Sequence, residues 1–308
     1  MALADDLLAV LDDPTHMWSH ALKELSSDGQ RLFLTLTLLP EPVSSDILQV
    51  AYTAQKLTRS ESFLDSLRSL EDSFISIEKR YAHLRSISFR NPSLEDFAKA
   101  HLDSNSDWLD SLLSAPKYYE QIIGVFSLAM AQTALLIDPA DRSQKPASPK
   151  YPGVKAWVER RAPELIDLAV ELIGSDNAYI YVKSRTSRLS QLLEILAAYD
   201  RPTRSAVREK LQAKIVSAIN PNGRDSANIM VELLRKPSYR NILDEVLEGD
   251  AAELMRENIL DKDSWKFGIL KDLDRILALE VGESWDSWGN EYVDYALQLT
   301  ADLKNSDD

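Results

Sequence analysis

The sequence predicts a mainly α-helical fold with a single β-hairpin in its first third. Apolar residues recur at helical spacing along most of the 308 residues. One short segment instead alternates apolar and polar side chains, as strands do. Only 9 glycines are present, which is few for a protein rich in tight turns. The chain is also too long for one small core, so we expect more than one domain.

Helices are expected throughout the region that precedes the hairpin. A helical lead-in over residues 1–13 stops at Pro14, because the residue before a proline disfavours the helical conformation. Ser27 and Asp28 are expected to cap a buried helix that ends at Pro40. The helices expected after the lead-in cover residues 15–25, 30–39, 45–55 and 63–70, with residues 42–46 forming a turn with a cap.

The hairpin is the one clear β signal in the chain. Two apolar strands flank a charged turn over residues 78–80. Their apolar residues are Phe74, Ile75 and Ile77, then Tyr81, Leu84, Ile87 and Phe89. Residues 91–93 close the hairpin, and Ser93 is expected to cap the next helix. Helices followed by a two-stranded wing over residues 14–104 are the winged-helix layout, which reads DNA in some proteins and is purely structural in others.

Residues 105–308 are expected to form an α-helical array. The apolar stretch 118–137 is predicted to be its central buried helix. Residues 138–152 contain four prolines and are expected to form an exposed loop. Helices of similar length then alternate with glycine and proline breaks, a pattern typical of an α-solenoid. An irregular helical bundle fits the same pattern, so both architectures stay open.

The amino-acid composition limits which cellular compartment and which classes of partner are expected. The chain has no cysteine, which excludes disulfides and thiolate sites and fits a reducing compartment. The N-terminus lacks the basic start of a signal peptide, and no apolar stretch approaches the roughly 18–20 residues of a membrane helix. We therefore expect a cytoplasmic protein without a membrane partner. The net charge of −14 makes nucleic acid a poor partner.

The motifs of common catalytic and cofactor sites are absent from the sequence. It contains neither a phosphate-binding G-x-x-x-x-G-K-[ST] loop nor a G-x-S-x-G nucleophile turn. His16 and His20 could share one helix face, but a metal site needs more ligands than these two. We expect no enzymatic activity, no cofactor and no metal. The best basic clusters, Arg160-Arg161 and Lys183, Arg185 and Arg188, are small and are interpreted as solvated helix faces.

Three of the six tryptophans lie close together in the sequence, at Trp265, Trp285 and Trp288. Core packing is one interpretation of this group. The other is a partly exposed aromatic surface for a protein partner, because tryptophan is enriched at interface hot spots. We therefore carry these three residues as candidate partner-binding residues.

The first part of the chain resembles a known family. The segments MWSHALKELSSDGQRLFLTLTLLPEPVSSDILQVAY, LRSLEDSFISIEK and ISFRNPSLEDFAKAHL are similar to the winged-helix region of bacterial STAND-type NTPases, which are related to immune-receptor NTPases. The similarity covers roughly residues 14–125, and FRNPSLEDF is its strongest piece. In that family an ATPase domain precedes the winged helix and a helical sensor array follows. Several members act in antiviral defence by recognising phage proteins.

This chain departs from the family pattern because it has no ATPase domain. The resemblance therefore implies a regulatory and sensing part, present either as a fragment or as a separate subunit. Its expected partners are a trigger protein, for which a phage protein is one candidate, and the ATPase and effector part of the same system. A stand-alone winged-helix transcription regulator and a helical adaptor protein are the alternatives.

The resemblance also marks one candidate site at the junction between the wing and the next helix. In the wider family a polar residue at this junction senses the bound nucleotide. The matching residues here are Arg90 and Asn91, which could reach a phosphate only on an ATPase domain supplied elsewhere. The alternative is that Asn91 and Ser93 shape the turn and cap the helix, as their residue types explain.

Overall fold

The computed structural model describes most of the first 200 residues and shorter stretches after them. The described residues are 15–55, 61–71, 73–81, 84–132, 148–173, 185–198, 208, 210–212 and 231–252. The chain divides into two compact units, Met1–Val182 and Lys183–Asp308, and each is considered by itself. The lead-in over residues 1–13 and the three candidate tryptophans lie outside the described residues.

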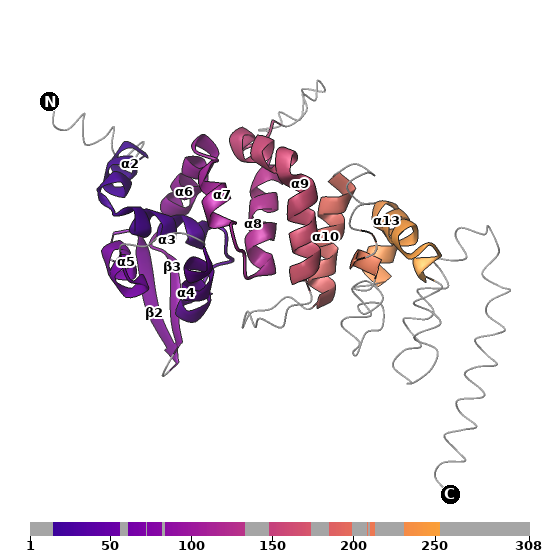
Figure 1. Ribbon diagram of the computed structural model, residues 1–308, viewed down its shortest axis with the longest axis horizontal. Helices are drawn as coiled ribbons and strands as arrows, with labels where there is room; N and C mark the ends of the chain where they lie inside the picture. Colours follow the sequence, from indigo (N-terminus) through magenta and orange to yellow (C-terminus); the bar gives the residue numbers. More distant parts are fainter. Residues whose placement is uncertain are drawn as a thin grey trace, which may run out of the picture. The chain divides into compact units, whose positions relative to one another are not determined.

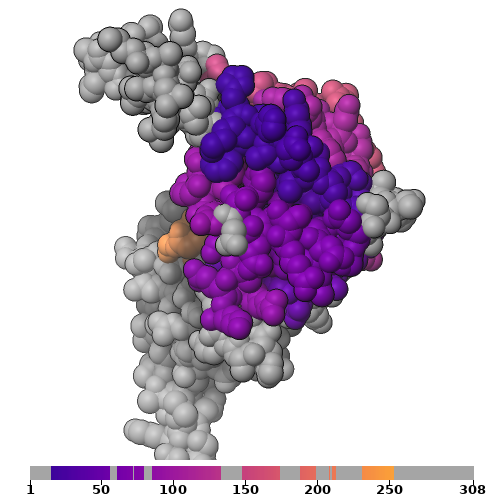
Figure 2. All heavy atoms as spheres, turned by 90° about the vertical axis from the view of Figure 1, so that its left-hand side faces the viewer, coloured from indigo at the N-terminus to yellow at the C-terminus, as the bar shows by residue number. Residues whose placement is uncertain are grey.

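The first unit is mainly helical and contains a small sheet, as the sequence predicts (Figure 1). Its helices are α2 (Thr15–Glu24), α3 (Ser27–Thr37), α4 (Ser45–Ala54), α5 (Phe63–Leu70), α6 (Pro92–Ser104), α7 (Trp108–Leu112), α8 (Tyr119–Met130) and α9 (Pro152–Leu172). Its strands are β1 (Val43–Ser44), β2 (Ile75–Tyr81) and β3 (Leu84–Phe89). In Figure 2 the face turned toward the viewer carries α2 in indigo and the hairpin region in purple.

The sheet is antiparallel with the strand order β1-β3-β2. Its third strand was not predicted, because β1 is only two residues long and offers no alternation to read. Val43 pairs with Ile87. Beyond the end of β1, the carboxylate of Glu41 accepts a hydrogen bond of 3.0 Å from the backbone N–H of Phe89. A side chain thus satisfies a backbone donor that a longer strand would have bonded.

The predicted position of the hairpin turn is wrong. Residues 78–80 belong to β2, which continues to Tyr81. Glu78 lies opposite Ser86, and Lys79 lies opposite Arg85. Figure 1 shows the hairpin extending beyond α4 and α5. Because this part of the hairpin projects past the core, charged side chains are tolerated within the strand and do not mark its end.

Two predicted helix caps are each displaced by one or two residues. Ser26, rather than Ser27 or Asp28, caps α3, and its hydroxyl accepts a hydrogen bond from the Gly29 N–H at 3.0 Å. Asn91, rather than Ser93, caps α6. Proline at the first position of α6 fits there because that position needs no N–H donor.

The core of the winged helix is built around Phe33 on α3. Its ring lies 5.1 Å from that of Phe74 and 5.3 Å from that of Phe89, with both pairs in edge-to-face geometry. Phe97 of α6 lies 6.4 Å away. These contacts confirm that α3 is a buried helix and not a strand, and they join α3 to the sheet and to α6.

Two glycines let the winged helix pack closely against the helices that follow it. A Cβ added at Gly124 of α8 would lie 2.5 Å from the carbonyl oxygen of Leu38, and one at Gly153 would collide with the carbonyl oxygen of Asp103. The Asp103 carboxylate accepts a hydrogen bond of 2.9 Å from the N–H of Val154, at the start of α9. The boundary expected after residue 104 therefore lies inside the first compact unit.

The predicted central helix and the loop after it are shorter than expected. Residues 118–137 were expected to form one helix, but α8 ends at Met130. Most of its residues are buried, and it packs along α9. The predicted exposed loop over residues 138–152 lies mostly outside the described residues. In its last part Ser148, Lys150 and Pro152 are exposed, whereas Tyr151 is buried and Pro152 already begins α9. The Lys150 ammonium lies 5.3 Å from the centroid of the Tyr151 ring.

In the second unit most of the described residues are helical. Helix α10 (Arg185–Ala198) packs against α13 (Pro237–Leu247), and residues 231–234 are helical too. Arg240 is only 5% exposed and bonds the Asp250 carboxylate at 2.8 Å. The choice between solenoid and bundle depends on residues outside the described part. Among the described helices, none combines the length and apolarity needed to cross a bilayer.

Candidate functional site

The junction between the wing and α6 holds the two residues singled out by the resemblance. The backbone N–H of Arg90 bonds the carbonyl oxygen of Phe74 at 3.0 Å, and its side chain is exposed. The Asn91 side-chain oxygen accepts hydrogen bonds from the Leu94 N–H at 3.0 Å and from the Ser93 hydroxyl at 2.6 Å. Asn91 therefore caps α6. A nucleotide-sensing role for either residue stays a prediction.

A carboxylate stands beside this junction. Burial raises the pKa of Glu41 although much of the residue is exposed, and the hydrogen bond from the Phe89 N–H lowers that pKa. Glu95 raises the pKa of Glu41 further, and Lys99 lowers it. An incoming phosphate would meet this negative charge, so the junction is a poor phosphate site unless a partner supplies cations.

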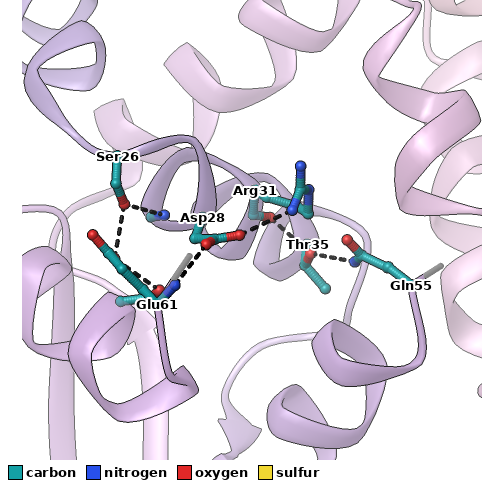
Figure 3. A network of polar contacts seen from close by, with 8 residues as sticks. Ser26, Asp28, Arg31, Thr35, Gln55 and Glu61 are labelled. Carbon is teal, nitrogen blue, oxygen red and sulfur yellow. Dashed lines mark hydrogen bonds and ion pairs between the residues drawn. The ribbon is translucent and has the colours of Figure 1, made fainter. Parts of the chain in front are cut away.

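A polar network with a buried centre lies between helix α3, the end of α4 and the start of α5 (Figure 3). Its centre is Asp28, which is only 1% exposed. The Asp28 carboxylate bonds the guanidinium of Arg31 at 3.0 Å and accepts a 3.0 Å hydrogen bond from the backbone N–H of Glu61. A buried carboxylate with a cation and an N–H donor is well satisfied, and it fixes the start of α5 against α3.

Hydroxyl and amide groups extend this network in both directions. The Ser26 and Ser66 hydroxyls donate to the Glu61 carboxylate at 2.8 Å and 3.2 Å. The Gln55 amide donates to the Thr35 hydroxyl at 2.8 Å. The network joins α3 to the end of α4 and to the start of α5. Sequence reasoning identified Asp28 only as a cap, because its partner Glu61 lies 33 residues away and nothing local reveals the pairing.

Helix α5 follows α4 in the positions of a helix-turn-helix pair, where the second helix reads DNA in DNA-binding members. Its exposed face carries little positive charge. Leu64 is 54% exposed, and Arg68 lies 3.6 Å from Asp65 in an exposed ion pair. Asp46 is exposed at the start of α4. This surface is better suited to a protein contact than to phosphates.

The wing carries a basic pair that sequence reasoning missed. Lys79 and Arg85 lie directly opposite each other on β2 and β3, and both are exposed. Within the described part of the chain, neither side chain takes part in an ion pair. Placing residues 78–80 in a turn hid this pair, because a turn residue has no cross-strand neighbour.

In the first basic cluster that the sequence suggested, Arg160 is exposed on α9, whereas Arg161 is paired with acids. The Arg161 guanidinium bonds the carboxylates of Asp110 and Glu164 and lies 5.2 Å from the ring centroid of Trp157. In the second unit Arg188 is buried, and Lys183 lies outside the described residues. The interpretation of a solvated helix face fits Arg160, which is exposed on α9.

Metal ligands do not gather in the described part of the chain. His16 and His20 are both exposed on α2. A search of the described residues for three or more clustered histidine, aspartate or glutamate ligands found no such group. Comparison of the chain with protein-family models, with curated proteins and with solved structures found no match.

Proposed function

We propose that this chain is the non-catalytic regulatory and protein-sensing part of a STAND-type NTPase that acts in the cytoplasm in bacterial antiviral defence. The winged helix would hold an ATPase domain supplied elsewhere, and residues 105–308 would bind the trigger protein. The observation that carries the proposal is the winged-helix element order combined with an α5 face that exposes Leu64 and a self-neutralised ion pair.

The physical logic of the proposal is a bistable assembly biased by binding. A trigger changes the ATPase only if it binds the active arrangement more tightly than the resting one. Tight packing at Gly124 and Gly153 supports this coupling. Because the packed segments have no free space between them, a displacement of the helices after the wing would also displace the winged helix.

Complex formation with an ATPase polypeptide tests the proposal. The purified chain is mixed with the ATPase encoded directly upstream, in the same reading frame or as a separate gene, and size-exclusion chromatography is run with ADP and with ATP. We expect a complex whose amount depends on the nucleotide and falls in the Leu64→Asp variant, with Leu64→Ala as a milder comparison. The absence of an ATPase both from the same reading frame and from the neighbouring genes would contradict the proposal, and so would an ATPase that never co-elutes with the chain.

A second candidate is a stand-alone winged-helix transcription regulator, and the exposed Lys79–Arg85 pair is the observation that favours it. Two cations neutralise few phosphates, however, and Asp46 and Asp65 lie on the helices that would approach the duplex. A gel shift at low salt decides the matter: tight binding to duplex DNA would place this candidate first.

A further inference from the structure

The inner face of the wing changes character along its length. Three cross-strand pairs share this face: Ile75 with Phe89, Ile77 with Ile87, and Lys79 with Arg85. Ile75, Phe89 and Ile87 are buried in the core. The third pair is exposed and stands one step farther out, where the hairpin has left the core. The same face of the hairpin is therefore apolar and buried near the core, and it carries two adjacent cations at its exposed end.

Two cations directly opposite each other destabilise the hairpin, whereas a cation opposite an acid would stabilise it. Residues directly opposite on an antiparallel pair have Cβ atoms about 4.5–5.5 Å apart, and like charges placed there repel. Charges on an exposed strand also discourage edge-to-edge aggregation. A lysine facing a glutamate would give the same protection and add an attraction. Edge protection therefore does not account for two cations that face each other.

We propose that the Lys79–Arg85 pair is the docking point for an acidic segment of a partner protein. One carboxylate can lie between the two cations and offset their repulsion. A hydrogen bond between an arginine and a carboxylate is also stronger than one between neutral groups. The inference concerns the wing itself and stands whether or not the partner belongs to a STAND-type system.

The surroundings of the wing favour a protein over a nucleic acid. The chain has a net charge of −14, which repels a duplex at long range. Exposed Leu64 and Asp65 on α5 suit a mixed apolar and polar protein contact and would oppose a phosphate backbone. A locally basic site on an acidic protein selects a ligand whose negative charge is confined to a short segment.

The test measures binding of a fluorescein-labelled oligoglutamate peptide and of a labelled DNA duplex to the full chain by anisotropy, at low and at physiological salt. The variant Lys79→Glu/Arg85→Glu reverses both wing charges. The control variant Lys155→Glu/Arg160→Glu makes the same change in net charge on α9. We expect the wing variant to lose at least about tenfold in peptide affinity and the control to stay close to the parent.

The wing variant is designed to keep the fold. It still places like charges opposite each other, so its melting temperature should match that of the parent. If it does not, Lys79→Gln/Arg85→Gln replaces it, with the same loss expected. Equal loss in the wing and control variants would overturn the inference. Tighter binding of the duplex than of the peptide, abolished by the wing variant, would also overturn it and make the wing a nucleic-acid surface.

Discussion

The buried network around Asp28 pairs its charged groups with partners, whereas the projecting wing places two like charges opposite each other. In the network, the Asp28 carboxylate has the Arg31 guanidinium and the Glu61 N–H as partners. In the wing, Lys79 faces Arg85 without an acid between them. An unmatched charge cannot persist in the interior, whereas water at the surface reduces its cost. Two like charges that face each other at the surface therefore point to a role other than stability, because an acid in place of one of them would have stabilised the fold.

The largest effect is expected from breaking the network. Asp28→Ala removes one partner of a buried pair and leaves the Arg31 cation without its counter-ion. We expect a loss of about 3–5 kcal/mol in the free energy of unfolding, measured by urea denaturation. Arg68→Ala is the matched control, because it breaks the exposed pair with Asp65 and should cost less than about 1 kcal/mol. Equal losses of unfolding free energy in the two variants would show that burial does not make the Asp28–Arg31 pair more important for stability than an exposed pair.

A steric change in the interior should have the next largest effect. Gly124→Ala brings a Cβ to 2.5 Å from the Leu38 carbonyl oxygen, and relieving that overlap requires backbone movement. We expect a loss of about 1–3 kcal/mol, measured by thermal unfolding. Gly249→Ala is the control, because no atom lies within 4 Å of its added Cβ. An unchanged melting temperature for Gly124→Ala would contradict the close packing described here.

The cap at the wing junction should have an intermediate effect. Asn91→Ala removes the acceptor for the Leu94 N–H, and we expect a loss of about 1 kcal/mol in unfolding free energy. Asn91→Asp keeps an acceptor and adds a negative charge that suits a helix N-terminus, so stability should be retained. If the ATPase complex loses its nucleotide dependence in Asn91→Asp while stability is unchanged, Asn91 does more than cap the helix.

The smallest effect, and one of opposite sign, is expected in the wing. Lys79→Glu turns the repulsive pair with Arg85 into an attractive one, and we expect a gain of about 0.2–1 kcal/mol. The gain should shrink as salt is added, because both side chains are exposed. Differential scanning calorimetry at two salt concentrations measures both quantities. A loss of stability in Lys79→Glu would show that the two cations do not repel in the folded protein.

The sequence was sufficient for the helical fold and the hairpin, because their signals are local. The run around Phe33 was identified as a helix from a nearby cap and from Pro40. Strand β1 was missed since two residues show no periodicity, and the turn was misplaced since charge was taken to mark a loop. The bond between Asp28 and Glu61 and the register of Lys79 with Arg85 depend on tertiary structure. No pattern within a few residues could reveal them.

The hydrogen bond between the Asp103 carboxylate and the Val154 N–H has a consequence for the order of assembly. The first turn of α9 takes its acceptor from a residue 51 positions earlier in the chain. During synthesis, α6 leaves the ribosome well before α9 does, so the acceptor is already available when the new helix emerges. The winged helix thus supplies the side chain that bonds the first turn of α9, whereas in a separate α9 peptide this N–H would have only water as its acceptor.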